Sequence, residues 1–352
     1  MKHVYKILNK TIAVYSDNRL FMEEFHRDYQ WFNQSPENTR HSDIQVDFHD
    51  NFLQINHKKI DISNHPTPMH FAFQLVVSEI MSRLDHYYLI HAGVVKMDDC
   101  LIILSGPPGI GKSTLVQNLI NKGFEFFSDD CAPLHKQSGM IYPFPRSMWI
   151  VDQQRTTSIR SKKAIPVKYD SQLYTPLKPS IIICLIDDTA AKLPIQLNLS
   201  LKSTDNPLIN ELKQLPGMTC IRRDPRYPEY RIEYQTSEFL SNSIQAICHT
   251  HKQHMWTIYR VPPIRKCFER QAILKKVSVH QAAAEIISEI KMFESCLSPL
   301  DDKSPMLSFV NISRHIQNAD CYFMTAGNLL SERNLIDRVL NEYHQKQKKI
   351  EL

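Results

Sequence analysis

The sequence predicts an α/β protein with three parts: an N-terminal α+β lobe, a phosphate-binding core and a mainly helical C-terminal part. Short apolar runs crowd the first 66 residues, which is typical of small strands. A glycine-rich loop then stands between an apolar run and an amphipathic segment. Apolar residues recur at helical spacing in the last third. We expect the parts to span residues 1–68, 69–235 and 236–352.

Length and composition indicate a globular protein. Of 352 residues, 42% are hydrophobic and 22% charged, and no apolar run approaches the roughly 18–20 residues needed to cross a bilayer. The first 19 residues lack the continuous apolar segment of a secretory signal, so we expect a cytoplasmic protein that does not engage a membrane. The eight cysteines never form Cys-x-x-Cys and are expected to be reduced thiols. A net charge of +5 suits a polyphosphate ligand but does not predict nucleic-acid binding.

The N-terminal lobe is predicted from its apolar runs and one helical pattern near Arg19–Phe32. The dipeptide Asp50-Asn51 is a hairpin signal between the last two runs. A second helix is expected over Met69–Leu84, where apolar residues return every three or four positions. The expected strands are Val4–Leu8, Thr11–Tyr15, Ile44–Phe48 and Phe52–Ile55.

Two apolar runs joined by the letters KMDD predict a β-hairpin before the glycine-rich loop. The runs are Leu89–Val95 and Cys100–Leu104. If Lys96 pairs with Cys100, His91 lies opposite the residue that precedes the loop, beside its mouth. A slip of one residue would turn the imidazole to the other face of the sheet.

The remaining elements follow from the same signals. We expect a helix over Lys112–Lys122, ended by a glycine, and then a buried strand at Phe124–Phe127. Another apolar strand is expected at Ser180–Asp187. In the last third, Ser278 and Gln281 form a capping box for a helix that continues to about residue 293, and Ser331 is expected to open a further helix.

The glycine-rich loop is the strongest functional signal. Three of the eight glycines of the chain fall within six residues, in the pattern Gly-x-x-x-x-Gly-Lys-[Ser/Thr] between a strand and a helix. Glycines let the backbone curl so that N–H groups point at phosphate oxygens. Lys112 is expected to reach the β- and γ-phosphates, and the Ser113 hydroxyl to bind Mg²⁺. The predicted ATP-binding residues are Gly106, Pro107, Pro108, Gly109, Ile110, Gly111, Lys112, Ser113 and Thr114.

An acidic pair, Asp129 and Asp130, ends the strand that follows the loop helix. We expect this strand to run parallel to Cys100–Leu104 in a strand–helix–strand unit. Ligands of such sheets bind at the carboxyl ends of the strands, so both carboxylates should arrive near the loop. Adjacent side chains at a strand end project in different directions. One can therefore serve Mg²⁺ while the other acts as general base toward an incoming hydroxyl. The structural alternative is a solvated turn.

The segment IHAGVV…LIILSGPPGIGKSTLVQNLINKGFEFFSDD resembles the P-loop domain of HPr kinase/phosphorylase and HPr-kinase-related proteins. The resemblance is specific over Leu89–Leu134 and looser as far as Ile186. It implies a core of the HPr-kinase and phosphoenolpyruvate-carboxykinase-like type. It also implies transfer of the γ-phosphate of ATP to a serine hydroxyl.

Carried over to this chain, the resemblance assigns catalytic roles to four residues. Asp129 corresponds to the catalytic base and His91 to the active-site histidine. Asp130 corresponds to the acidic neighbour of the base and would bind Mg²⁺ together with Ser113. Lys112 serves the phosphates. The chain departs from the family where two prolines replace a small polar pair in the loop. It also lacks the downstream Glu-x-x-x-Arg-Asn run, so HPr as acceptor, phosphorolysis and a hexameric ring do not carry over.

The sequence therefore predicts an ATP- and Mg²⁺-dependent kinase whose acceptor is a hydroxyl, in the first place a serine of a protein or peptide. Two alternatives stay open: a kinase of a small molecule such as free serine, and a nucleotide-binding regulatory module without catalysis. No base-recognition motif chooses between ATP and GTP. A homo-oligomer is compatible with the sequence.

Two weaker sets of residues complete the candidates. Arg146 is the best placed arginine for gripping the γ-phosphate, because a planar guanidinium group suits phosphate oxygens. The letters HTHKQH bring three histidines together, for which a polar helix end is favoured over a zinc site. These histidines are His249, His251 and His254, and the weaker arginine candidates are Arg222, Arg223, Arg226, Arg231 and Arg260.

Overall fold

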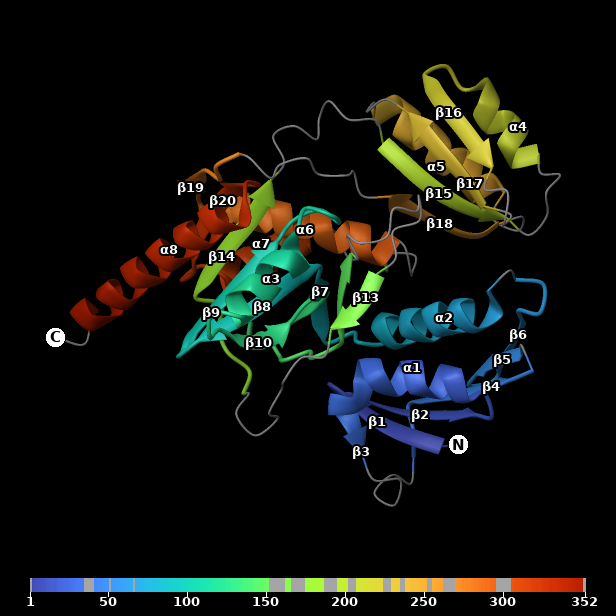
Figure 1. Cartoon of the computed structure of the whole chain (residues 1–352), viewed down its shortest axis with the longest axis horizontal. Coiled ribbons are helices and arrows are strands. Elements are labelled where there is room, and N and C mark those ends of the chain that lie inside the picture. Colours follow the sequence, from blue (N-terminus) through green and yellow to red (C-terminus); the bar gives the residue numbers. More distant parts are fainter. Residues whose placement is uncertain are drawn as a thin grey trace.

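The protein is an α/β molecule in the computed structural model (Figure 1). The α/β class expected from the sequence is confirmed. Among the helices of the described residues, none has the length and apolar character to cross a membrane. The structure describes residues 2–34, 41–50, 52–65, 67–151, 162–165, 175–186, 195–201, 207–223, 229–234, 238–251, 255–261, 270–295 and 305–350.

The N-terminal lobe is a six-stranded sheet in the order β3-β1-β2-β4-β5-β6, covered by helices α1 and α2 (Figure 1). All four expected strands and the first helix are present. The two strands that the sequence did not predict are β3, which has two residues, and β6, whose residues KKID carry no apolar alternation. The elements are β1 (Lys2–Ile7), β2 (Lys10–Ser16), α1 (Arg19–Tyr29), a 3-10 turn at Gln30–Phe32, β3 (Asn33–Gln34), β4 (Ile44–His49), β5 (Phe52–Ile55), β6 (Lys58–Asp61) and α2 (Pro68–Ser82).

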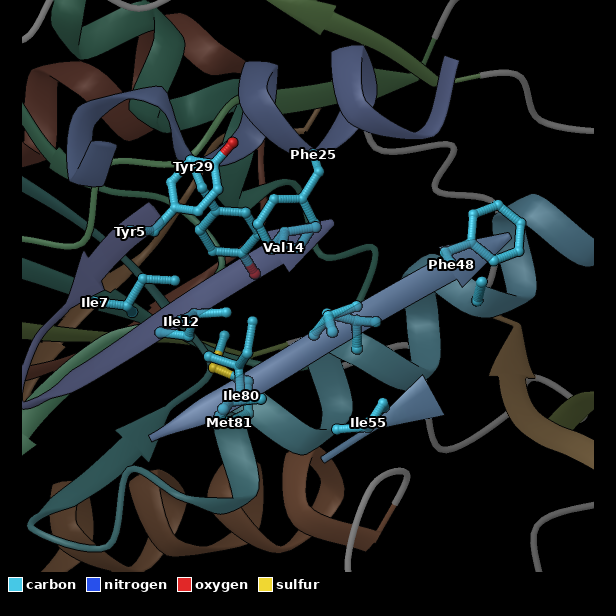
Figure 2. Close-up of a cluster of buried hydrophobic side chains, with 14 of the residues drawn as sticks. Tyr5, Ile7, Ile12, Val14, Phe25, Tyr29, Phe48, Ile55, Ile80 and Met81 are labelled. Atoms are coloured by element: carbon cyan, nitrogen blue, oxygen red, sulfur yellow. The ribbon is translucent and has the colours of Figure 1, made fainter. Parts of the chain in front are cut away.

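Aromatic side chains fill the core of this lobe (Figure 2). Tyr5, Phe25 and Tyr29 lie together between β1 and α1, with ring centroids of Phe25 and Tyr29 4.8 Å apart. The side chains of Ile80 and Met81 from α2 belong to the same buried cluster. The core therefore extends from the sheet across both helices. It also includes Cys131 and Phe144, which lie outside the N-terminal lobe in the sequence.

The central sheet has the order β10-β8-β9-β14-β20-β19. Strands β9, β14 and β20 run parallel, whereas β8 is antiparallel to both β9 and β10. Two of its strands, β19 and β20, come from the region that we expected to be mainly helical. The strands are β8 (Ala92–Met97), β9 (Cys100–Ser105), β10 (Glu125–Ser128), β14 (Ile181–Ile186), β19 (Leu274–Lys276) and β20 (Asp320–Thr325).

Helices cover both faces of the central sheet. On one face, α3 (Lys112–Ile120) and α8 (Leu329–Ile350) pack against side chains such as Ile102 and Ile183. On the other, α6 (Val279–Ser295) and α7 (Pro305–His315) share a buried cluster with β8, β9 and β14. Strands that are buried on both faces read as nearly continuous apolar runs, which explains the letters LIIL and IIICLI.

The register of the β8–β9 hairpin differs from the expected one. Met97 pairs with Cys100, so Ala92, and not His91, lies opposite Ser105. The expected pairing was wrong by one residue, because the loop has two residues instead of three. Asp98 adopts a left-handed conformation with φ of 50°, which permits this tight turn.

The sequence predicted caps for two helices, α6 and α8. The capping box of α6 is confirmed, since Ser278 and Gln281 exchange side-chain and backbone hydrogen bonds of 3.0 and 3.3 Å. Helix α8, however, begins at Leu329, before the expected start. Its cap is Asn328, whose Oδ1 accepts a 2.8 Å hydrogen bond from the N–H of Ser331.

The remaining elements form smaller units. Strands β7 and β11 pair beside the central sheet, and β12 pairs with β13. A four-stranded antiparallel sheet, β16-β17-β15-β18, carries helices α4 and α5 (Figure 1). Their bounds are β7 (Tyr87–Ile90), β11 (Ala132–His135), β12 (Met148–Val151), β13 (Lys162–Ile165), β15 (Ile195–Leu201), α4 (Pro207–Gln214), β16 (Met218–Arg223), β17 (Glu229–Tyr234), α5 (Glu238–Thr250) and β18 (Met255–Val261).

Candidate nucleotide site

The glycine-rich loop connects the end of β9 to the start of α3, as expected. Gly106, Gly109 and Gly111 have φ angles of 146°, 79° and 103°, in the region that favours glycine. The first of them also passes close to β14, because a Cβ on Gly106 would lie 2.6 Å from the carbonyl oxygen of Leu185. The local backbone therefore requires glycine at these positions.

Lys112 is the first residue of α3 and is 6% exposed. Its ammonium group donates hydrogen bonds to the carbonyl oxygens of Gly106 (2.5 Å) and Pro107 (3.2 Å). The positive charge is thus held at the curled loop. Ser113 and Thr114, both partly exposed, follow in the first turn, where backbone N–H groups and the helix dipole favour an anion.

The acidic pair lies at the same edge of the sheet as the loop. Strand β10 runs in the same direction as β9, as expected, although β8 lies between them. Asp129 follows the strand and is 3% exposed, whereas Asp130 is partly exposed. Their unequal burial shows that the two carboxylates have different surroundings, which suits different roles.

Gly93 shows how closely Asp129 approaches the loop helix. This glycine lies in β8, and a Cβ placed on it would be 2.5 Å from Cγ2 of Val116 in α3. The same point is 3.8 Å from Oδ1 of Asp129. The carboxylate therefore lies on the face of the sheet that α3 covers, near the second turn of that helix. Gly93 is not among the predicted site residues, although a glycine inside a strand signals a close approach.

His91 lies between β7 and β8 and contacts the acidic pair through the backbone. Its Nδ1 is 3.2 Å from the carbonyl oxygen of Asp130. A carbonyl only accepts, so this hydrogen bond places the proton on Nδ1 and makes Nε2 the basic nitrogen of the neutral ring. The structure thus brings His91 to the acidic pair, even though the register that suggested this position was wrong.

Arg146 contacts the N-terminal lobe. Its Nη2 lies 3.2 Å from Oδ2 of Asp28, and its guanidinium carbon is 5.0 Å from the ring centroid of Tyr29. Burial opposes the charge of Arg146, but Tyr29, Asp28 and Asp130 together raise its pKa above the usual value. The guanidinium is therefore permanently charged and within electrostatic reach of the acidic pair. Its expected role as a phosphate ligand stays a prediction.

The other candidates lie away from this edge or outside the described residues. His251 is buried, and its Nε2 lies 2.9 Å from Oε1 of Glu211, next to the end of α5. Among the residues that the structure describes, no three His, Cys, Asp or Glu side chains gather as a metal site. Of the arginines, four lie in the strands of the four-stranded sheet, namely Arg222, Arg223, Arg231 and Arg260. Arg226 and His254 fall outside the described residues.

The described cysteines agree with the expectation of reduced thiols. Cys131, which directly follows the acidic pair, is buried and free, and burial raises the pKa of its thiol to about 12. It is therefore protonated at neutral pH and is not a nucleophile. The other free cysteines of the described residues are Cys100, Cys184, Cys248 and Cys321.

No family model and no curated protein matches the chain. Among solved structures, it is similar to the HPr(Ser) kinase/phosphatase from Coxiella burnetii, with 15% sequence identity and a TM-score of 0.21. The match covers 47% of this chain and 96% of that chain. So distant a similarity carries no argument of its own, and the interpretation of the site depends on its residues.

Proposed function

We propose that the protein is an ATP-dependent phosphotransferase that moves the γ-phosphate to a hydroxyl group, in the first place a serine of a protein or peptide. One observation carries the proposal: the buried carboxylate of Asp129 and the lysine-bearing loop lie at one edge of the central sheet, on the face covered by α3. A phosphate held by the loop would have a carboxylate nearby. A loop that only binds a nucleotide does not require one.

The loop residues bind and orient the phosphates. Backbone N–H groups of the curl and of the first turn of α3 would serve as a preformed anion nest, apart from the N–H of Ile110, which donates a 3.2 Å hydrogen bond to the carbonyl of Pro107. Lys112 exchanges its two carbonyl contacts for phosphate oxygens and stabilises the charge that develops on the transferred group.

The Ser113 hydroxyl and the Asp130 carboxylate fit a Mg²⁺ ion, because both are partly exposed oxygen donors. Magnesium at nucleotide sites takes only one or two protein ligands, which agrees with so small a donor set. When bound, the ion supplies charge neutralisation at the phosphates. The two residues would hold it at the rim of the loop.

Asp129 orients the acceptor hydroxyl and takes its proton as the oxygen bonds to the γ-phosphorus, while the bond from that phosphorus to the β–γ bridging oxygen breaks and ADP leaves. Its burial suits this role, since an exposed carboxylate would be solvated and less able to act as a base. His91, held by Asp130, presents Nε2 as a second basic atom for moving the proton to solvent.

The test is γ-labelled ATP incubated with purified protein and a cell lysate, comparing the wild type with Asp129→Asn. We expect the label to appear on a polypeptide as phosphoserine, and the variant to bind ATP but to transfer no label. Label on free serine or another metabolite alone would identify a small-molecule kinase. If the wild type binds ATP and Asp129→Asn changes no measurable reaction, the protein is a regulatory module and the proposal fails.

A further inference from the structure

A buried ion pair connects the N-terminal lobe to the segment that follows the acidic pair. Asp28, on α1, is 1% exposed, and Tyr29 beside it is fully buried. Arg146 reaches both from the other side, with a 3.2 Å contact to the carboxylate and its guanidinium over the tyrosine ring. Within the described part of the N-terminal sheet and its first helix, Asp28 is the one buried charged side chain.

The residues around Arg146 also hold the strand end that carries the acidic pair. The N–H of Phe144 donates a 3.1 Å hydrogen bond to the carbonyl of Phe127, and Phe144 pairs with Ser128 in a short parallel bridge. The ring of Phe144 packs 5.4 Å from that of Phe32 in the N-terminal lobe. Residues 144–147 thus form a brace between α1 and the end of β10. We call them the brace segment.

The ion pair is a poor device for stability alone. Oδ1 of Asp28, the hydroxyl of Tyr29 and Nε of Arg146 are buried and have no hydrogen-bond partner among the described residues. Buried polar atoms without partners cost free energy, and a buried ion pair is often no better than apolar packing. A well-packed apolar side chain at position 28 would serve the core as well. The charge therefore has another use.

We propose that Asp28 is a positioning residue of the phosphotransferase site, which acts by holding the Arg146 guanidinium in the brace segment. The inference rests on the proposed function. With Asp28 as its partner, the guanidinium is fixed between the N-terminal lobe and Asp130. Without that partner, it turns toward the acidic pair and displaces the carboxylates. The N-terminal lobe is then a structural part of the site and not a separate module.

The variant that tests this is Asp28→Asn, which keeps the shape of the side chain and removes its charge. A displacement of about 1 Å at a reacting centre can cost on the order of 10²-fold in rate. We expect turnover at saturating ATP to fall by roughly tenfold or more, with the Kd for ATP within about threefold of the wild type. Hydrogen exchange at residues 127–131 should become faster. Asp17→Asn is the matched control, because Asp17 is an exposed residue of the same lobe that pairs with His49.

Two results would overturn the inference. One is an Asp28→Asn protein with a lower melting temperature but wild-type turnover and wild-type exchange at residues 127–131. The other is weaker ATP binding in Arg146→Lys together with tighter ATP binding in Asp28→Asn, because Arg146 would then be a phosphate ligand. Hydrogen exchange needs no substrate, so it tests the coupling even if the wild type transfers no phosphate and the proposed function fails. Should Asp28→Asn not fold, Asp28→Glu keeps the charge and moves the carboxylate by one methylene, so it shifts the guanidinium without freeing it and is expected to show a smaller increase in exchange at residues 127–131; wild-type exchange in this variant would overturn the inference.

Discussion

The N-terminal lobe and the loop edge of the central sheet bury different kinds of side chain. Aromatic and aliphatic groups fill most of the lobe, where Ser16 donates a hydrogen bond to the carbonyl of Phe48 and Asp28 on α1 is the buried charge. The loop edge buries two charged side chains. Lys112 begins α3, and Asp129 lies beside the second turn of the same helix. Burial of charge is costly. Charges are kept at this edge at the expense of stability, which is typical of a functional site. Apolar packing dominates the lobe, whereas the loop edge buries two charged side chains, Lys112 and Asp129.

The largest expected effect comes from removing the charge at the loop edge. Asp129→Asn should lower phosphoryl transfer by on the order of 10²–10⁴-fold, the usual contribution of a general base. Its free energy of unfolding should stay the same or rise, because a buried charge is lost. Urea unfolding and transfer of labelled phosphate measure the two quantities on one preparation. A large loss of stability in this variant would mean that the carboxylate is structural, and would break the contrast between the two regions.

The reverse outcome is expected in the N-terminal lobe. Phe25→Ala removes a fully buried ring and should lower the free energy of unfolding by about 3–5 kcal/mol. Leu20→Ala on the same helix is the control, since Leu20 is 64% exposed and its loss should cost little. At a temperature where both variants are folded, ATP binding should be unchanged. Equal destabilisation by the two variants would contradict the position of α1 on the sheet.

A smaller effect is expected at Gly93, where β8 packs against α3 at the loop edge. The methyl group of Gly93→Ala would clash with Val116 and push α3, at a cost of about 1–3 kcal/mol. ATP binding should weaken because the loop moves with the helix. Val116→Ala in the same chain removes the clashing methyl group and should restore part of both. Calorimetric titration with ATP and urea unfolding measure the recovery. If the second substitution restores nothing, the close approach of β8 and α3 is wrong.

The smallest effect concerns the buried thiols and is confined to alkaline pH. Burial raises the pKa of Cys131 to about 12, whereas an unfolded thiol ionises near 9. Above pH 9 the unfolded chain therefore loses a proton that the folded chain keeps, so stability falls as the pH rises toward 12. At neutral pH the thiol is protonated in both the folded and the unfolded chain, so this loss of stability is absent. Unfolding at pH 7 and pH 10 should show a shallower pH dependence for Cys131→Ala. An unchanged slope would mean that this thiol is not shielded in the folded protein.

Local patterns could predict the loop and the strand ends, whereas distant pairings could not be predicted. The glycines at positions 106–111 and the carboxylates after β10 follow from residue types in a short window. Strand β20 pairs with β14, so that Cys321 lies next to Ile182, and no local pattern joins residues so far apart. Asp28 and Arg146 are separated by 118 positions, so no local pattern could reveal that they are partners. The β8–β9 register failed because it depends on one backbone conformation, at Asp98.

The order of the strands in the central sheet has a consequence for synthesis on the ribosome. Strand β14 is flanked by β9 on one side and by β20, near the end of the chain, on the other. The sheet can therefore be completed only after residues 320–325 have emerged, while the N-terminal strands and α1 are available early. During translation, the N-terminal lobe can fold first, while the edge of β14 that pairs with β20 stays unpaired. A chain truncated before residue 320 should form that lobe and leave β14 open to aggregation.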